Sequence, residues 1–385
     1  MPPPLNFAVI GCGALAMGQH IPNISKSPQT CLHTCCDLSA ERLTECRAQH
    51  GAAHTTTNYL EAISHPQVDA IVLATTEKLR LPVIAACVEQ GKPIYVEKPI
   101  ANTLEEAYQI QRLVNESGIP FCAGHNRRAA PAMIDAHRIF HQHMQNPQPA
   151  PWRYDREGPG GRPQLPDDGA ASMSVRINDD WFSWKSWVFD KQQAPLGPML
   201  FEMTHFTDIC NWFLAAEPVE VVALEGGVLN HGVVIRYEGG EIASILMGSN
   251  GTFAYPKELY EVMGHGAIVV VDHMVEVRTA GIAGAVPRKC FSLLNDRHPH
   301  VGSEGGLSGW LAKKQHACEE AAAAGDPSLL VECWNIELFA AGLIPIHTNR
   351  SISSTACFTT PCEISCNASA ETASPDSSLS TSSLT

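Results

Sequence analysis

The chain has 385 residues, of which 44% are hydrophobic and 17% are charged, and its formal net charge is -14 at pH 7. This composition is that of a globular protein and excludes a disordered or fibrous chain, while the length allows two domains. The negative charge argues against a nucleic-acid partner, because binding to phosphates needs a basic surface. No apolar run approaches the roughly 20 residues that cross a bilayer, so we expect no membrane partner.

The 14 cysteines do not form the frame of a short secreted domain. The chain starts with Met1-Pro2-Pro3-Pro4 and then an apolar strand-like segment, which lacks the features of a signal peptide. We therefore expect a cytoplasmic protein with reduced thiols. No Cys-x-x-Cys spacing occurs, and the sequence predicts no metal site.

Short apolar strands alternate with helical stretches from Leu5 to about Phe121. The expected strands are 7–10, 31–36, 70–74, 94–96 and 120–123, and the expected helices are 14–25, 40–50, 82–90 and 104–116. This alternation is typical of a parallel sheet with helices on both faces. We therefore assign residues 1–124 to an α/β Rossmann domain.

The pattern changes after about residue 125. A Pro- and Gly-rich stretch, 147–166, predicts a long surface loop, and later stretches at 317–324 and 329–343 are expected to form closing helices. Between them, strand-like runs follow one another without long helices, at 219–224, 232–237, 242–247, 259–263 and 267–271. We expect residues 125–350 to form an α+β domain with a mostly antiparallel sheet, and the Ser/Thr-rich residues 351–385 to form a disordered tail.

A glycine-rich turn, Gly11-Cys12-Gly13-Ala14-Leu15-Ala16, follows the first strand and opens the first helix. The glycines allow the backbone to approach a pyrophosphate closely, and the helix N-terminus offers unpaired N–H groups. Asp37 ends the second strand, where its carboxylate can accept hydrogen bonds from ribose hydroxyls and repel a 2′-phosphate. The sequence therefore favours NAD over NADP. The alternatives are a glycine-rich turn of another α/β protein and an Asp37 that caps the next helix.

Two further segments carry candidate chemistry. Glu97-Lys98-Pro99 follows a buried strand, at the edge where ligands of open α/β sheets bind, and a lysine there can hold a substrate hydroxyl and help to move its proton. The Lys98–Pro99 bond is a candidate for the cis isomer. In the helix that begins near Phe201, the spacing of Glu202, His205 and Asp208 allows one shared face, and a histidine with carboxylate support suits a general base. The alternatives are a surface turn and a structural histidine.

Together these residues resemble the glucose–fructose oxidoreductase / inositol dehydrogenase (Gfo/Idh/MocA) family over about residues 5–350. The resemblance implies a Rossmann domain followed by a domain with an open, mostly antiparallel sheet, and a homodimer or homotetramer packed through that sheet. It also implies hydride transfer between NAD and a carbinol carbon of a sugar, sugar derivative or cyclitol. The motifs that carry it occur in the family's order: the Gly11 turn, Asp37, Thr75-Thr76, Glu97-Lys98-Pro99, Gly124-His125-Asn126-Arg127-Arg128 and Glu202-x-x-His205-x-x-Asp208.

Carried over by position, the resemblance assigns roles to individual residues. Lys98 is then the catalytic lysine and His205 exchanges the proton of the substrate hydroxyl. Asp208 lines the site or orients that histidine, and either Glu202 or Asp208 is its dyad partner or the dyad is absent. The expected cofactor contacts are Gly11, Cys12, Gly13, Ala14, Leu15, Ala16, Asp37, Thr75, Thr76, Glu97, Lys98, His125 and Asn126. The expected substrate contacts are Lys98, Arg127, Arg176, Asn178, Trp184 and His205.

Two departures from the family pattern bear on the substrate. Phe201 replaces the Asp that pairs with the histidine in inositol dehydrogenases, which puts inositol itself in doubt. Glu77-Lys78-Leu79-Arg80 replaces the usual Asn-His-x-His after the third strand, and its two cations either favour an anionic substrate or face solvent. Trp181, Trp184 and Trp187 either stack on a sugar ring or belong to the core or a subunit interface.

Two other functions fit the same residues. Some relatives are glycosidases that oxidise one carbon transiently, eliminate the glycoside and return the hydride, so that no net NADH forms. A non-catalytic sensor would keep the nucleotide-binding fold and oxidise nothing. The joint presence of Lys98 and His205 favours an enzyme.

Overall fold

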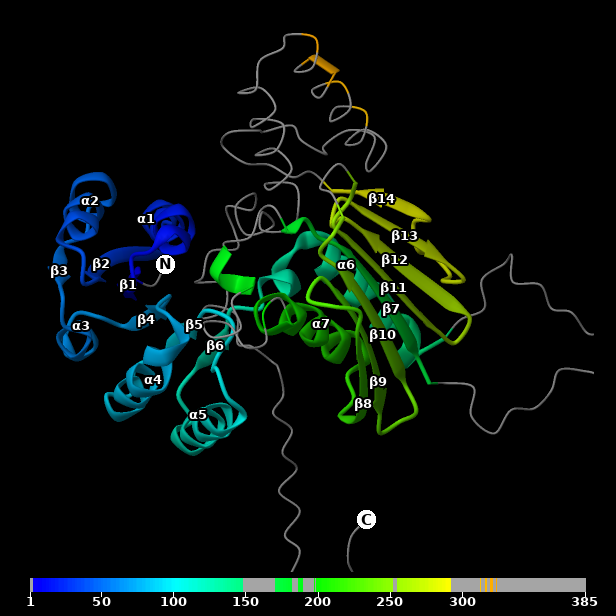
Figure 1. Cartoon of the computed structure of the whole chain (residues 1–385), viewed down its shortest axis with the longest axis horizontal. Coiled ribbons are helices and arrows are strands. Elements are labelled where there is room, and N and C mark those ends of the chain that lie inside the picture. Colours follow the sequence, from blue (N-terminus) through cyan, green and yellow to red (C-terminus); the bar gives the residue numbers. More distant parts are fainter. Residues whose placement is uncertain are drawn as a thin grey trace, which may run out of the picture.

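The computed structural model describes residues 3–147, 170–181, 186–189, 197, 199–251 and 255–291, with the isolated residues 312, 316, 319, 320 and 323. Two sheets organise them, one built from the blue and cyan part of the chain and one from the green and yellow part (Figure 1). The first has the strand order β3-β2-β1-β4-β5-β6 and the second has the order β14-β13-β12-β11-β7-β10-β9-β8. The expected fold class is confirmed. The expected loop after residue 147, most of the closing helices and the tail lie outside the described residues.

The first sheet is parallel throughout. Alternate residues of its central strands pack into different cores, with Ile71 and Leu73 on one face and Ala70 and Val72 on the other, as expected when helices cover both faces. The strand order reverses between β1 and β4, which is where ligands of such sheets bind. The strands are β1 (Leu5–Ile10), β2 (Thr30–Cys36), β3 (His54–Thr56), β4 (Ala70–Leu73), β5 (Ile94–Val96) and β6 (Phe121–Ala123).

The helices of this domain connect consecutive strands. They are η1 (Ala16–His20), α1 (Ile21–Lys26), α2 (Ala40–His50), α3 (Tyr59–Ser64), η2 (Glu77–Leu79), α4 (Arg80–Glu89) and α5 (Leu104–Ser117). The helix after the glycine-rich turn contains one π-turn, η1, directly before α1. Pro22 has no N–H and its ring crowds the preceding turn, so the wider turn relieves a conflict that a regular helix would have. The side chain of His20, at the end of the π-turn, is buried.

The second sheet has one face covered by helices. Its strands are antiparallel except for the parallel pair β7–β10. They are β7 (Ser172–Asn178), β8 (Pro218–Glu225), β9 (Asn230–Tyr237), β10 (Ile242–Gly248), β11 (Glu258–Gly264), β12 (Ala267–Asp272), β13 (Glu276–Ala280) and β14 (Arg288–Cys290). The other elements are η3 (Asn126–Ala129), α6 (Pro131–Gln145), η5 (Ser186–Phe189), η6 (Met199–Met203) and α7 (Thr204–Leu214).

The core of the second domain lies between this sheet and the helices α6 and α7. Phe140 of α6 and Phe206 and Phe213 of α7 are buried against the inward-facing residues of the strands. Strand β7 lies in the middle of the sheet, although the sequence analysis did not assign it as a strand. Within the described part of the chain, no helix is long and apolar enough to cross a membrane.

The conformation of Gly11 gives a stability prediction. Its φ of +91° is unfavourable for any residue with a side chain, and an added Cβ would lie 2.7 Å from the Ala74 carbonyl oxygen. We therefore expect Gly11→Ala to lower the free energy of unfolding by about 3 kcal/mol. Gly13→Ala is the matched control, because its added methyl group meets nothing within 4 Å, and its effect should stay below about 1 kcal/mol. Urea denaturation of the NAD-free variants measures both, and equal effects would contradict the prediction.

Candidate active site

The turn between β1 and η1 leaves its backbone open to a ligand. A Cβ on Gly13 would meet no atom within 4 Å, and Ala14 and Leu15 are exposed. The first N–H groups of a helix have no acceptor within that helix. Unpaired N–H groups next to open space are what a pyrophosphate needs. The turn therefore fits a dinucleotide.

Asp37 lies at the edge of this turn. Its Oδ2 accepts a hydrogen bond from the Cys12 N–H (2.8 Å) and its Oδ1 accepts one from the Ser39 N–H (2.9 Å). The cap of α2 is Ser39, whose hydroxyl accepts from the Arg42 N–H, so the alternative of Asp37 as the helix cap is wrong. The Arg42 Nη1 lies 3.5 Å from Asp37 Oδ2, which places a basic residue beside Asp37 that the sequence analysis did not consider.

Lys98 reaches from the first domain to the second. It follows β5, and its peptide bond to Pro99 is cis, as the sequence analysis suggested. The Lys98 Nζ donates to the Phe201 carbonyl oxygen (2.5 Å) and lies 3.4 Å from Glu202 Oε1. The Lys98 side chain is 19% exposed. The lysine is thus held by the segment that carries Glu202 and His205, and its side chain is still partly accessible.

The neighbouring Glu97 points into the first domain. Its Oε1 lies within hydrogen-bonding distance of His20 Nε2 (2.9 Å) and accepts from the Tyr95 hydroxyl (3.2 Å). Burial raises the pKa of Glu97, but the hydrogen bond with His20 and the charge of Lys98 outweigh it and hold this pKa below its ordinary value. Glu97 therefore ties the strand end before Lys98 to the π-turn helix.

Glu202 is surrounded by three cations. Its carboxylate oxygens lie 3.4 Å from Lys98 Nζ, 3.4 Å from Arg127 Nη2 and 3.6 Å from Lys257 Nζ. Burial raises the pKa of Glu202, but Lys257, Lys98 and Arg127 together lower it far below its ordinary value. Glu202 is therefore an anion that joins groups from both domains.

Arg127 is buried, with 2% of its surface exposed. Its guanidinium donates to both oxygens of Glu258, with a shortest distance of 2.6 Å, and lies 4.9 Å from the centre of the Phe206 ring. Glu258 also accepts a hydrogen bond from the Tyr260 hydroxyl. The expected substrate contact of Arg127 stays a prediction, and these surroundings favour a positioning role instead.

His205 lies on α7 next to His125, which follows β6. The two rings are 5.7 Å apart and nearly perpendicular. Among the described residues, the Nδ1 atoms of both are buried without a hydrogen-bond partner. Burial, together with Arg127 and Lys98, lowers the pKa of His205 well below its ordinary 6.5. His205 is therefore neutral at pH 7 and has a lone pair with which to accept a proton.

The expected carboxylate partner of His205 is not found at either position. Asp208 accepts two hydrogen bonds from Arg128, at 2.7 Å from Nε and 2.6 Å from Nη2, and Glu202 faces its three cations. Neither carboxylate makes a hydrogen bond to His205 in the described part of the chain. Of the two possibilities, a carboxylate partner or no dyad, the described residues show no dyad, because Arg128 binds Asp208 and three cations surround Glu202. Spacing on a helix does not reveal this competition.

Residues 5–125 match a family model described as the oxidoreductase family with an NAD-binding Rossmann fold. The matched segment contains the Gly11 turn, Asp37 and Lys98. Over these residues the chain is similar to the Gfo/Idh/MocA oxidoreductase family. The family resemblance inferred from the motifs is confirmed over these residues.

Two curated relatives match part of the chain. The 1,5-anhydro-D-fructose reductase of Ensifer adhaerens is 31% identical over 216 residues, which cover 53% of this chain and 58% of the reductase. The scyllo-inositol 2-dehydrogenase (NAD(+)) of Bacillus subtilis is 30% identical over 132 residues, which cover 34% of this chain and 38% of the dehydrogenase. The match thus covers less than two thirds of the length of each relative.

Solved structures of similar fold cover both domains. The oxidoreductase domain protein from Kribbella flavida has a TM-score of 0.62 and 18% identity, over 92% of this chain and 98% of its own. A levoglucosan dehydrogenase in complex with NADH has a TM-score of 0.60 and 19% identity, over 90% of this chain and 97% of its own. At these identities the similarity shows a shared fold.

Arg176 and Asn178, two of the expected substrate contacts, lie on strand β7. Val175 and Ile177 of β7 pack in the core under the helices. Side chains alternate along a strand, so Arg176 and Asn178 point to the opposite face, away from His205. There the Arg176 Nη1 donates to the Pro256 carbonyl oxygen (3.2 Å). The expected contacts of Arg176 and Asn178 are therefore corrected, and Trp184 lies outside the described residues.

Arg80 is not available to an anionic substrate. It is 2% exposed, and its Nη2 donates to the carbonyl oxygens of Thr75 (3.1 Å) and Lys98 (3.4 Å). It therefore joins the ends of β4 and β5 from inside the protein. Of the two cations in this segment, Lys78 is exposed and Arg80 is buried. Both explanations offered for the pair, an anionic substrate and a solvent-facing position, are wrong for Arg80.

Several residues of this network were missed from the sequence. Lys257 Nζ lies 3.2 Å from Asp179 Oδ2 as well as near Glu202. Glu258 and Tyr260 occupy the inward face of β11 together with Val262, since all three are buried. Glu258 could have been found from the sequence, because it alternates with the apolar residues of β11 that face the core. No such signal exists for Asp179 or for the contact of His20 with Glu97.

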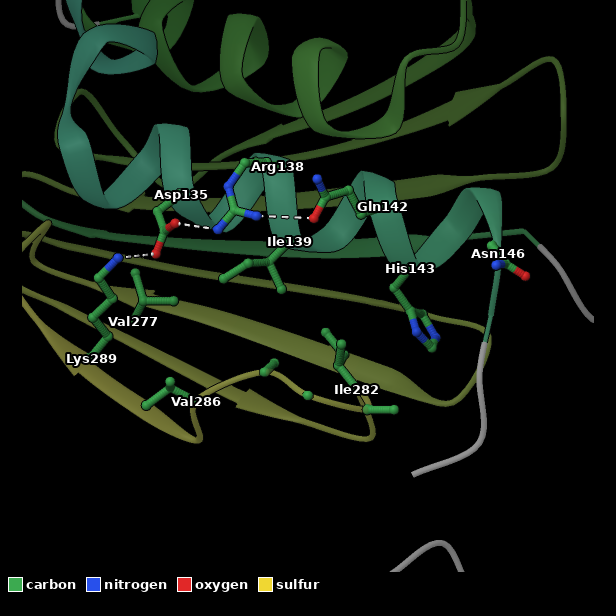
Figure 2. Close-up of a pocket in the computed structure, with 13 residues that line it drawn as sticks. Asp135, Arg138, Ile139, Gln142, His143, Asn146, Val277, Ile282, Val286 and Lys289 are labelled. Carbon is green, nitrogen blue, oxygen red and sulfur yellow. Dashed lines mark hydrogen bonds and ion pairs between the residues drawn. The ribbon is translucent and has the colours of Figure 1, made fainter. Parts of the chain in front are cut away.

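A cavity of about 310 Å³ lies elsewhere, between α6 and the β13–β14 hairpin. Figure 2 shows Asp135 of α6 paired with Arg138 and Lys289, and the apolar side chain of Ile282 at the other end. None of the predicted site residues lines this cavity. The candidate active site is therefore the junction of Lys98, Glu202 and His205.

The lowered pKa of His205 gives a prediction for stability against pH. The folded pKa lies below 6.5 and the unfolded pKa near it, so below pH 6.5 the unfolded state binds the additional proton and stability falls. His205→Gln removes this group. The unfolding free energy of the variant should therefore fall less steeply between pH 7 and pH 5, by up to about 1.4 kcal/mol per pH unit. Denaturation at a series of pH values measures the slopes, and equal slopes would place the pKa of His205 near its ordinary value.

Proposed function

We propose that the chain is an NAD-dependent oxidoreductase that transfers hydride between nicotinamide and a carbinol carbon of a sugar, sugar derivative or cyclitol. The observation that carries the proposal is the contact of Lys98 with Phe201 and Glu202. This contact brings a lysine from the edge of the dinucleotide-binding sheet to the start of the helix that carries His205. Two groups suited to a substrate hydroxyl thus come together from different domains.

The roles of the residues follow from their surroundings. The Lys98 amino group donates a hydrogen bond to the substrate oxygen, and Glu202 holds that amino group in place. His205, which is neutral and whose Nδ1 has no hydrogen-bond partner among the described residues, accepts the hydroxyl proton as the carbon is oxidised. NAD, when bound, supplies the hydride acceptor. Arg127 acts through Glu202 and is a positioning residue.

The relatives support this class of substrate. Their names include a 1,5-anhydro-D-fructose reductase and a scyllo-inositol 2-dehydrogenase, and a structure of similar fold is a levoglucosan dehydrogenase with NADH. All three substrates are polyhydroxylated rings. We propose the same class for this chain, with the sugar itself unassigned.

We propose NAD as the cofactor rather than NADP. The Asp37 carboxylate lies beside the turn and would repel a 2′-phosphate. Arg42 offsets part of that charge, but it is half exposed and its contact with Asp37 is long. The contacts of Thr75, Thr76, His125 and Asn126 with the cofactor, the domain limits at residues 124 and 350, and a cytoplasmic location stay predictions.

The roles of Lys98 and His205 are tested by substitution. Lys98→Ala and His205→Ala should each lower kcat by about 10²- to 10⁴-fold, the usual range for general acid–base groups, with NAD affinity retained. Lys78→Ala, an exposed lysine, and His143→Ala, a buried histidine of α6, are the controls and should keep their turnover. The measurement is NADH formation with monosaccharides, uronates, nucleotide sugars and cyclitols. Unchanged turnover in both test variants would overturn the assignment.

The same assay separates the alternative functions. Cleavage of a glycoside without net NADH would show a glycosidase that uses NAD transiently. A protein that binds NAD but turns over nothing in the panel would be a sensor. Either result would replace the proposed net oxidation.

We also propose that the open face of the second sheet forms a homo-oligomer interface, as the family resemblance implies. Within the described residues this face carries exposed apolar side chains, among them Val222, Leu224, Val234 and Leu246. All residues of β8 are exposed. An apolar surface of this kind is typical of a protein–protein contact.

A charge on this face tests the interface. Leu246→Lys places an ammonium group where we expect a second copy to pack, so it should shift the protein from dimer or tetramer to monomer. Leu38→Lys is the control, because Leu38 is an exposed apolar residue of the first domain. Light scattering after size-exclusion chromatography measures the mass. An oligomer that survives in Leu246→Lys, or a wild-type monomer, would contradict this interface.

A further inference from the structure

Three thiols converge beneath the dinucleotide-binding turn. The Sγ atoms of Cys12, Cys35 and Cys46 all lie within 4.8 Å of one another, and all three residues are fully buried. Cys12 belongs to the glycine-rich turn, Cys35 to β2 and Cys46 to α2. No Cys-x-x-Cys spacing marks this group in the sequence, because its members come from three separate elements.

A fourth sulfur adjoins the group. The Sδ of Met17, on the π-turn η1, lies 3.5 Å from Cys46 Sγ. Met17 is only partly buried, and Gly18 next to it is exposed. The Met17 side chain is therefore more exposed than the three thiols that it adjoins.

The spacing fits a three-coordinate ion with little movement. A cation held at about 2.3 Å by three sulfurs in one plane separates those sulfurs by about 4 Å. Thiolate and thioether ligands without nitrogen or oxygen select soft ions such as Cu(I), while structural zinc takes four ligands from Cys and His.

We propose that Cys12, Cys35 and Cys46, with Met17, form a binding site for Cu(I) that opposes the binding of NAD. Each thiol that binds the ion loses one proton to solvent, so coordination by two or three thiolates leaves a complex with net negative charge. That charge lies under the turn that faces the pyrophosphate and next to Asp37, which is bound to the Cys12 N–H. Two anions on opposite sides of one turn repel each other, and by linkage each ligand weakens the other.

The first test measures binding of Cu(I) to the reduced full-length protein without NAD, in competition with a chromophoric Cu(I) chelator under anaerobic conditions. We expect one equivalent in wild type and an affinity at least about 100-fold lower in Cys46→Ala. Cys87→Ala is the matched control, because Cys87 is equally buried but packs on the other face of the first sheet. Equal Cu(I) affinity in Cys46→Ala and wild type would overturn the site.

A spectroscopic test does not depend on the variant folding. X-ray absorption of the wild-type Cu(I) protein should show only sulfur neighbours, at about 2.3 Å, and nitrogen or oxygen neighbours would overturn the site. Zn²⁺ should bind to the site more weakly than Cu(I) and should not displace it. Tighter binding of Zn²⁺ than of Cu(I) would overturn the choice of ion.

The second part of the proposal is tested by NAD binding. One equivalent of Cu(I) should raise the Kd of wild type for NAD about 10-fold, within the usual range for coupled sites, and should leave the Kd of Cys46→Ala unchanged. An unchanged Kd in wild type that has bound Cu(I) would refute the coupling. Because this assay needs no substrate, its failure is distinct from a failure of the proposed oxidoreductase activity.

Discussion

The buried carboxylate of Glu202 is the interaction on which the candidate site depends. It brings together Lys98 from the first domain, Arg127 from the start of the second and Lys257 from the residue before β11. A buried anion is unfavourable unless cations and hydrogen bonds compensate it, and removal of one partner leaves the others uncompensated. Arg127 also pairs with Glu258, and Lys257 also pairs with Asp179. Glu202 is the anion that all three cations share, and it holds Lys98 beside the helix of His205.

The local features of the site could be predicted from the sequence. The alternation of strands and helices gave the first domain, the glycine-rich turn marked the dinucleotide end of its sheet, and Lys98 and His205 stood out by position. The pairing of charges could not be predicted, since Glu202 meets partners 104 and 75 positions away in the chain. Spacing on a helix suggested Glu202 and Asp208 as partners of His205, but Arg128 and the cations around Glu202 bind them instead.

The other errors have physical causes of the same kind. The position of Arg176 depends on which face of β7 its neighbours bury, and β7 was not assigned as a strand. Arg80 follows an exposed lysine in the sequence, yet it turns inward to the carbonyl oxygens of two strand ends. The thiols of Cys12, Cys35 and Cys46 meet only when β1, β2 and α2 pack together. In each case the tertiary fold decides the partner of a side chain.

The central claim is that Glu202 positions Lys98 for oxidation of a polyol by NAD. Kinetics of Glu202→Gln, a variant of nearly the same shape without the charge, test it most directly on a sugar that the wild type oxidises. The account predicts that kcat falls by about 100-fold, within the range for acid–base groups, while the Kd for NAD changes less than about twofold. An unchanged kcat, or a wild type that binds NAD but oxidises no polyol, would contradict it.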